Sequence, residues 1–128
     1  MTERELTLRL EIMRRFAGTG GPPDVADGPE LRALAAAHVV VLDDGGRIVM
    51  AHPFAAHERG ARVDAGGRTW WGNCAWDGLG IVAALGLPRA TVRAQDIELR
   101  VDGGEVRADA RFHVAVPAAR WWEDIEHT

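Results

Sequence analysis

The stretch Gly72-Asn-Cys-Ala-Trp-Asp-Gly-Leu-Gly-Ile-Val-Ala-Ala-Leu-Gly-Leu-Pro88 decides the fold, because it predicts one short helix with clear boundaries. Asn73 is a favourable N-cap, and Gly86 followed closely by a proline is typical of a helix end. The residues between them are apolar almost all round, so we expect a buried helix. Gly78 and Gly80 lower the helix propensity, which indicates close packing against a sheet.

Short β-rich runs lie on both sides of this helix in the sequence. Before it, Ala61–Ala65 and Arg68–Trp71 enclose two glycines, which predicts a hairpin. After it, three further strands are predicted, with an Asp-Gly-Gly turn between the last two: Ala90–Arg93, Ile97–Val101 and Val106–Val116. A final amphipathic helix, Ala118–Glu126, is expected to begin after a proline.

The N-terminal part has a different pattern. Helical spacing predicts helices over Glu3–Phe16 and Pro29–His38, and Thr2 begins a candidate capping box. Two β-rich runs, Val39–Leu42 and Arg47–Ala51, enclose an Asp-Asp-Gly-Gly cluster and predict a hairpin. Helix, helix and hairpin is the outline of a reduced winged helix, which can read DNA or serve as a cap or dimerisation element.

These elements predict an α+β fold with two parts. Residues 1–53 form a short winged-helix-like N-terminal cap. Residues 54–128 form a core, in which a mixed β-sheet packs against the buried cysteine-bearing helix and the C-terminal helix.

Composition excludes several classes of function. The 128 residues are 47% hydrophobic and 27% charged, which is ordinary for a soluble globular protein. Fifteen arginines and no lysine exclude Schiff-base chemistry on a lysine side chain. The net charge of −4, with both signs mixed along the chain, disfavours nucleic acid as a partner. No apolar run is long enough to span a bilayer, and the charged N-terminus does not resemble a secretory signal, so we expect a cytoplasmic protein.

Cys74 is the single cysteine of the chain, so neither an internal disulfide nor a thiolate metal cage can form within it. If Asn73 caps the helix, Cys74 is its first residue, where the helix dipole stabilises a thiolate. Asp77 lies three residues further and shares its face. A thiolate can capture an electrophile while a neighbouring carboxylic acid protonates the leaving group. We expect each group to raise the pKa of the other. The alternative is ordinary packing of a small apolar cysteine, with an aspartate that suits the helix dipole.

Two segments carry a resemblance to a known family. The segment Arg68-Thr-Trp-Trp-Gly-Asn-Cys-Ala-Trp-Asp-Gly-Leu-Gly-Ile81 resembles the active-site segment of the alkylmercury (organomercurial) lyases, in which a strand leads into a helix bearing C-A-x-D. The segment Phe112-His-Val-Ala-Val-Pro-Ala-Ala-Arg-Trp-Trp122 is similar to the last conserved strand and helix of that family. The helical N-terminal part fits the helical domain of the family.

The resemblance implies roles for two residues and for mercury. Cys74 holds the organomercurial as a thiolate complex, Asp77 delivers a proton to the carbon, and both are donors to Hg(II) as product or bound ion. Soft mercury explains the need for thiolates. The family also uses a second cysteine, expected near Arg107 or Ala108, where this chain has none. The same pair could therefore act on another small-molecule bond.

Other residues complete the predicted site. Trp70, Trp71 and Trp76 flank the cysteine and could form the walls of an apolar substrate pocket, although core packing explains them equally well. Arg111 and His113 share one face of the last predicted strand and are further candidates for the pocket. Arg111 could bind an anionic substrate, but an ordinary surface arginine is the more expected role. No glycine loop cradles phosphate, so no organic cofactor is expected.

Four histidines could serve as bases or metal ligands, His52, His57, His113 and His127, and His113 is the best placed of them. A structural role is the more expected one for each. The expected partners are a small-molecule substrate and a second copy of the chain in a homodimer, with no nucleic acid or membrane. Two rival functions stay open. One is a non-catalytic homologue that binds a small molecule or soft metal, and the other is a winged-helix regulator that senses an electrophile or metal at Cys74.

Overall fold

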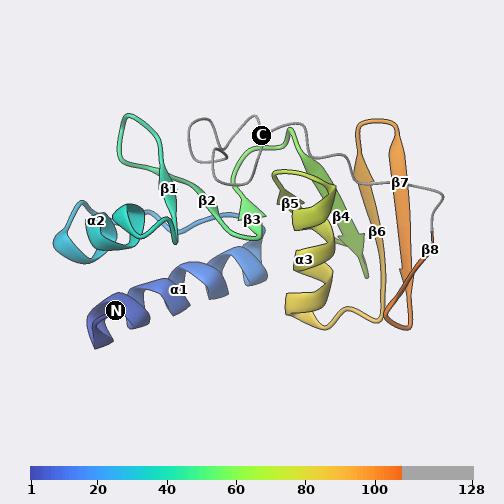
Figure 1. The fold of residues 1–128 in the computed structure, drawn as a ribbon, viewed down its shortest axis with the longest axis horizontal. Helices are drawn as coiled ribbons and strands as arrows, with labels where there is room; N and C mark the ends of the chain where they lie inside the picture. The colour runs from blue at the N-terminus through green and yellow to red at the C-terminus, as the bar shows by residue number, and fades with distance from the viewer. Residues whose placement is uncertain (108–128) are drawn as a thin grey trace.

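The computed structural model describes residues 1–107. Within them lie three helices, α1 (Glu3–Thr19), α2 (Pro29–Ala36) and α3 (Ala75–Leu85). The predicted helix Ala118–Glu126, most of the predicted strand Val106–Val116, and the candidate residues Arg111 and His113 lie outside the described residues. The described part is an α+β fold, as the sequence predicts (Figure 1).

Two antiparallel sheets accompany the helices. The first has the order β1-β2-β3, with bounds Val41–Leu42, Ile48–Ala51 and Phe54–Ala55. The second has the order β5-β4-β6-β7-β8, and its strands are β4 (Ala61–Ala65), β5 (Arg68–Gly72), β6 (Arg89–Ala94), β7 (Ile97–Asp102) and β8 (Glu105–Arg107). Every strand pair among residues 1–107 is antiparallel, so the mixed sheet expected from the sequence is not found in this part of the chain. Short turns join most neighbouring strands, and such turns produce antiparallel pairs.

Helix α1 begins with the predicted capping box and runs past its expected end at Phe16. The side chain of Thr2 and that of Glu5 each accept a hydrogen bond from the backbone of the other residue. Gly20, with a φ of 80°, ends the helix and donates its N–H to the carbonyl of Phe16. The helix therefore passes through Gly18 and ends at Gly20, where glycine adopts the left-handed conformation at little cost.

Helix α2 ends at Ala36, before the expected His38. Val39 and Val40 both donate their backbone N–H to the carbonyl of Leu34, which closes the helix. Strand β1 consequently begins at Val41, two residues later than the sequence suggests. The predicted order of helix, helix and hairpin is confirmed, while the winged-helix shape stays a prediction.

Helix α3 packs on one face of the second sheet, against β4, β5 and β6 (Figure 1). A Cβ atom on Gly78 would lie 2.5 Å from Cγ1 of Val92 and 3.2 Å from Cβ of Ala61. The predicted close packing is thus confirmed at Gly78. The predicted burial holds for one face, which carries Gly78, Ile81 and Val82, whereas Trp76 on the outer side is 65% exposed. Apolar composition alone does not distinguish a helix buried on one face from one that is enclosed.

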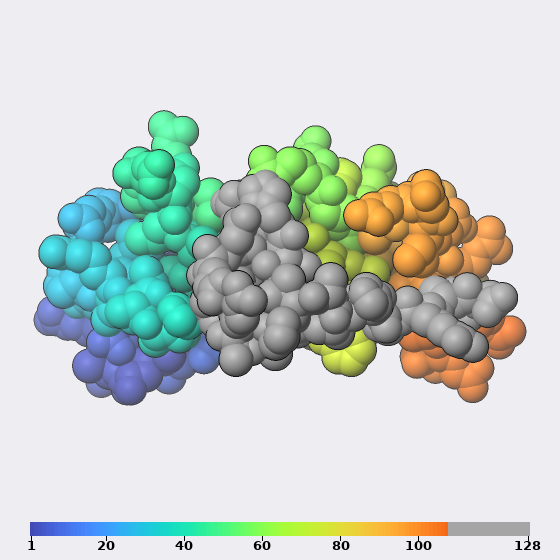
Figure 2. Space-filling view, turned by 45° about the horizontal axis from the view of Figure 1, so that its top comes forward, coloured from blue at the N-terminus to red at the C-terminus, as the bar shows by residue number. Residues whose placement is uncertain are grey.

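One hydrophobic core extends from the helical end of the molecule to the second sheet. The stacked rings of Phe16 and Phe54, with centroids 5.5 Å apart, join α1 to β3. The same cluster reaches Val63, Ile81 and Val92. The predicted division after residue 53 falls between β2 and β3, which pair with each other. In the space-filling view, the N-terminal helices and the strands β6–β8 lie at opposite ends of the molecule (Figure 2).

The helices offer no sign of membrane insertion. Within residues 1–107, none combines the length and the apolar character that crossing a bilayer requires.

Candidate functional site

The N-cap of α3 is Cys74. Its backbone is extended, with φ −149° and ψ 174°, and its carbonyl accepts the first helical hydrogen bond, from the N–H of Gly78 at 3.0 Å. The prediction that Asn73 caps the helix and that Cys74 is the first helical residue is therefore wrong by one position. The cause is that β5 pairs one residue further than expected, as far as Gly72 opposite Ala61.

Asp77 occupies the third position of α3 and faces the cysteine. The thiol of Cys74 donates a hydrogen bond to Oδ2 of Asp77, with a sulfur–oxygen distance of 3.7 Å. The Asp77 side chain is 18% exposed, and Cys74 is half-buried. The structure thus brings together the two residues that the C-A-x-D spacing places on one face.

Burial raises the pKa of the Cys74 thiol above its ordinary value of 9.0. The negative charge of Asp77 and its hydrogen bond with the thiol also raise this pKa, while the backbone N–H groups of Asp77 and Trp76 lower it. The N–H groups of the helix N-terminus therefore stabilise the thiolate as expected, but burial and the charge of Asp77 have the larger combined effect on the pKa. At neutral pH Cys74 rests as a thiol.

Burial also raises the pKa of Asp77 above its ordinary value of 3.8. The charge of His52, the thiol of Cys74, and the backbone N–H groups of Asn73 and Cys74 act in the opposite direction. Both pKa values are raised, as the sequence predicts, but desolvation is the first cause in each case. The expected mutual effect is found only for Cys74, because Asp77 raises the pKa of the thiol whereas Cys74 lowers the pKa of Asp77.

His52, for which the sequence analysis favoured a structural role over that of a base or metal ligand, lies beside Asp77. Its Nδ1 lies 4.0 Å from Oδ1 of Asp77, which is ion-pair distance when the imidazole is protonated. His52 and Pro53 form the connection between β2 and β3, joined by a cis peptide bond. No local spacing could reveal this contact, because it depends on how the first sheet packs against α3.

Two glycines allow these segments to approach each other. A Cβ atom on Gly72 would lie 2.9 Å from Cβ of Asp77, so the end of β5 can pass close to the first turn of α3 only without a side chain. A Cβ atom on Gly80 would lie 3.2 Å from Cβ of Pro53. Gly80 therefore packs against the β2–β3 connection, where the sequence analysis expected a sheet.

The three tryptophans near the cysteine have different environments. Trp70 is 2% exposed, and its indole N–H donates to the carbonyl of Ala17 at 2.9 Å, beneath the guanidinium of Arg68. It therefore packs in the core against the end of α1. Trp71 is half-buried, and Trp76 is largely exposed. The role of these three residues in a substrate pocket stays a prediction.

The donors available to a metal ion are few. Among residues 1–107, no group of three or more His, Cys, Asp or Glu side chains is arranged to hold a metal ion. Cys74 and Asp77 thus offer one sulfur and one carboxylate, which is a set open to further donors from a substrate or solvent.

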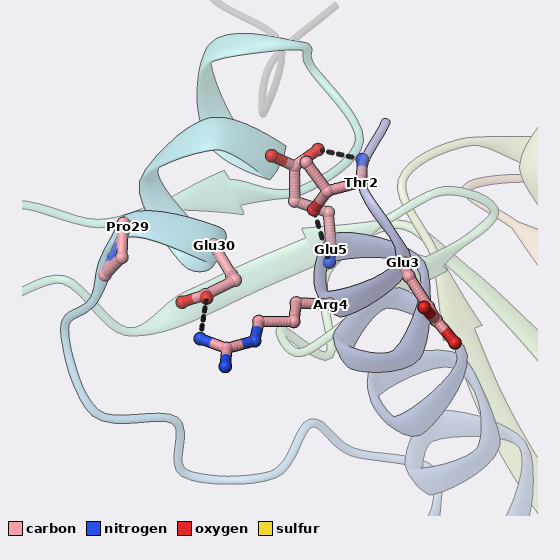
Figure 3. A pocket seen from close by; sticks show the side chains of 6 residues that line it. All are labelled: Thr2, Glu3, Arg4, Glu5, Pro29 and Glu30. Carbon is pink, nitrogen blue, oxygen red and sulfur yellow. Dashed lines mark hydrogen bonds and ion pairs between the residues drawn. The ribbon is translucent and has the colours of Figure 1, made fainter.

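A surface hollow of about 410 Å³ lies between the N-terminal ends of α1 and α2, away from Cys74 (Figure 3). Four of its polar side chains pair with each other: Thr2 and Glu5 form the capping box, and Arg4 lies 4.0 Å from Glu30. Because these groups stabilise a helix end and each other, the Cys74–Asp77 pair is the stronger candidate for a functional site.

Comparison with known proteins gives one result. The family model for alkylmercury lyase matches residues 54–128. This range includes β4, β5, α3 and the Cys74–Asp77 pair. Neither the curated proteins nor the solved structures yield a match.

Proposed function

The chain belongs to the alkylmercury lyase family, and we propose that it cleaves the carbon–mercury bond of organomercurials with Cys74 and Asp77. The observation that carries this proposal is the hydrogen bond from the thiol to Oδ2 of Asp77, at 3.7 Å. It provides a soft sulfur donor and a proton acceptor within the opening turn of one helix.

The first step is capture of the organomercurial cation by sulfur. A sulfur–mercury bond forms, the proton of the Cys74 thiol passes to Asp77, and the previous ligand of mercury leaves as an anion. The raised pKa of Cys74 keeps the thiol protonated until mercury arrives. Mercury is soft enough to displace that proton, since metal binding to a thiol releases it.

The second step is protonolysis. The Asp77 carboxylic acid gives its proton to the carbon, the carbon–mercury bond breaks, and the hydrocarbon leaves. Hg(II) remains on the sulfur of Cys74, with the Asp77 carboxylate as its neighbour. Burial, which raises the pKa of Asp77, favours retention of the proton until this step.

The third step is release of mercury. Because the chain has a single cysteine, two small-molecule thiols from solution take Hg(II). One of their protons returns to Cys74, and the other is released to solvent. Repeated turnover therefore requires the external thiol. Release of the first equivalent of hydrocarbon does not require it.

The test is benzene release from phenylmercury in the presence of excess thiol, measured by gas chromatography. The wild-type protein is expected to release benzene, and Cys74→Ser and Asp77→Asn are expected to lose this activity. Asp44→Asn, the same chemical change in the exposed β1–β2 turn, is the matched control and should behave like the wild type. Tight binding of phenylmercury at Cys74 without any benzene would contradict the lyase proposal and favour a binding protein.

A further inference from the structure

The connection between β2 and β3 is held firmly beside α3. The strand residues on either side of it, Ala51 and Phe54, are each 1–2% exposed and belong to the hydrophobic core. Pro53 rests against Gly80 of α3, where no side chain intervenes. His52 is thereby fixed at the side of the first helical turn, and its side chain is 32% exposed.

The two oxygens of Asp77 face different partners. Oδ2 accepts the hydrogen bond from the thiol of Cys74 at 3.7 Å, and Oδ1 lies 4.0 Å from Nδ1 of His52. The torsion that exchanges the two oxygens of an aspartate is broad and roughly two-fold, so an unheld carboxylate turns easily. A partner on one oxygen fixes the direction of the other.

Because the two oxygens of Asp77 face different partners, we propose that His52 is a positioning residue. It holds Oδ1 of Asp77, so that Oδ2 stays directed at Cys74 and at the carbon bound to mercury. This inference rests on the proposed lyase function. His52 itself contacts neither the sulfur nor the substrate in the proposed steps. The distance of 4.0 Å exceeds that of a direct hydrogen bond, and such contacts commonly shorten when the substrate is bound.

A pair of substitutions separates positioning from simple packing. His52→Asn retains an N–H donor at the branch of the side chain that carries Nδ1, whereas His52→Leu retains bulk without a donor. His57→Leu, in the loop between β3 and β4, is the matched control. Each protein is mixed with phenylmercury for a single turnover, and two quantities are measured: the amount of phenylmercury bound to Cys74 and the rate of benzene release.

We expect His52→Leu to bind a full equivalent of phenylmercury and to release benzene about 10–100-fold more slowly, since misplacement by about 1 Å can cost a factor of 100. His52→Asn is expected to restore most of the rate. A wild-type rate in His52→Leu would overturn the inference, and so would an equal loss in both variants. If the wild-type protein itself releases no benzene, the proposed function fails, and the inference about its proton delivery fails with it.

A second measurement tests the pair without any turnover. The 15N resonance of His52 Nδ1 should differ between the wild-type protein and the Asp77→Ala variant. The 15N resonances of His57 should be the same in both proteins. An unchanged His52 resonance would show that the two side chains do not interact in solution, whatever the outcome of the kinetic test.

Discussion

Helices α1 and α3 begin with the same kind of pair, an N-cap residue and an acidic residue three positions on, and use it differently. In α1, Thr2 accepts from the N–H of Glu5 at 3.1 Å, and Glu5 accepts from the N–H of Thr2 at 3.0 Å. In α3, Cys74 makes no side-chain capping hydrogen bond, and its thiol faces the carboxylate of Asp77. The first pair stabilises the helix end, while the second leaves its functional groups directed at each other.

The surroundings of the two pairs explain why this difference matters. Thr2 is exposed and Glu5 is partly exposed. Cys74 and Asp77 are both partly buried, and burial raises the pKa of each. A good N-cap contributes about 1 kcal/mol. The start of α3 lacks this stabilisation, and two of its polar groups are partly desolvated. A loss of stability of this kind is expected if the pair is the proposed site.

Replacement of Cys74 by serine should have the largest effect. Cleavage of phenylmercury is expected to disappear, because an alcohol does not bind mercury as a thiol does. The free energy of unfolding, measured by urea denaturation, should increase by about 1 kcal/mol, since serine caps the N–H groups of α3. Activity in Cys74→Ser, or a loss of stability, would break the comparison between the two helix starts.

Replacement of Asp77 by asparagine should reduce benzene release about 100–10,000-fold, which is the usual contribution of a general acid. The same change should lower the pKa of Cys74, because it removes a negative charge that raises it. Alkylation by iodoacetamide, followed as a function of pH, should therefore be faster near pH 8 in the variant. An unchanged alkylation profile would show that Asp77 does not act on the thiol.

The raised pKa of Asp77 also gives a signed effect on stability. Because the folded protein binds this proton more tightly than the unfolded chain, the contribution is fully present below pH 3.8 and is lost as pH rises through the folded pKa. The stability of the wild-type protein relative to Asp77→Asn should consequently increase as the pH is lowered from 7 toward 4.

Replacement of Gly78 by alanine sharpens the comparison at the level of packing. The added Cβ would meet Val92 at 2.5 Å, and we expect a loss of about 1–3 kcal/mol from overpacking. Gly18→Ala in α1 is the matched control, because nothing lies within 4 Å of its added Cβ. That variant should gain about 0.5–1 kcal/mol in urea denaturation. Equal gains in both variants would contradict the close approach of α3 to the sheet.

The smallest effect is expected at the start of α1. Thr2→Ala removes one side of the capping box and should cost about 1 kcal/mol or less, since this helix end is exposed. The rate of benzene release should stay at the wild-type value. A change in that rate would show that the two helix starts are not independent.

Local signals in the sequence predict much of this fold. The capping box at Thr2, the hairpin around Gly66-Gly67 and the end of α3 at Gly86 all depend on residues close in the chain, and each is confirmed. The adjacency of Cys74 and Asp77 follows from helical spacing in the same way.

Tertiary packing decides the features that the sequence did not predict. The N-cap is Cys74 and not the expected Asn73, because Gly72 pairs with Ala61 across the sheet. His52 reaches Asp77 only because the first sheet lies beside α3, and Gly80 accepts Pro53 for the same reason. Neither contact produces a spacing that can be recognised along the chain.

The most direct test of the proposed reactive pair is a crystal structure of Asp77→Asn soaked with phenylmercury. With the proton donor removed, we expect mercury bonded to Sγ of Cys74 with the phenyl group still attached, next to the amide at position 77. Mercury bound elsewhere, with Cys74 unmodified, would contradict the assignment of this helix start as the site of cleavage.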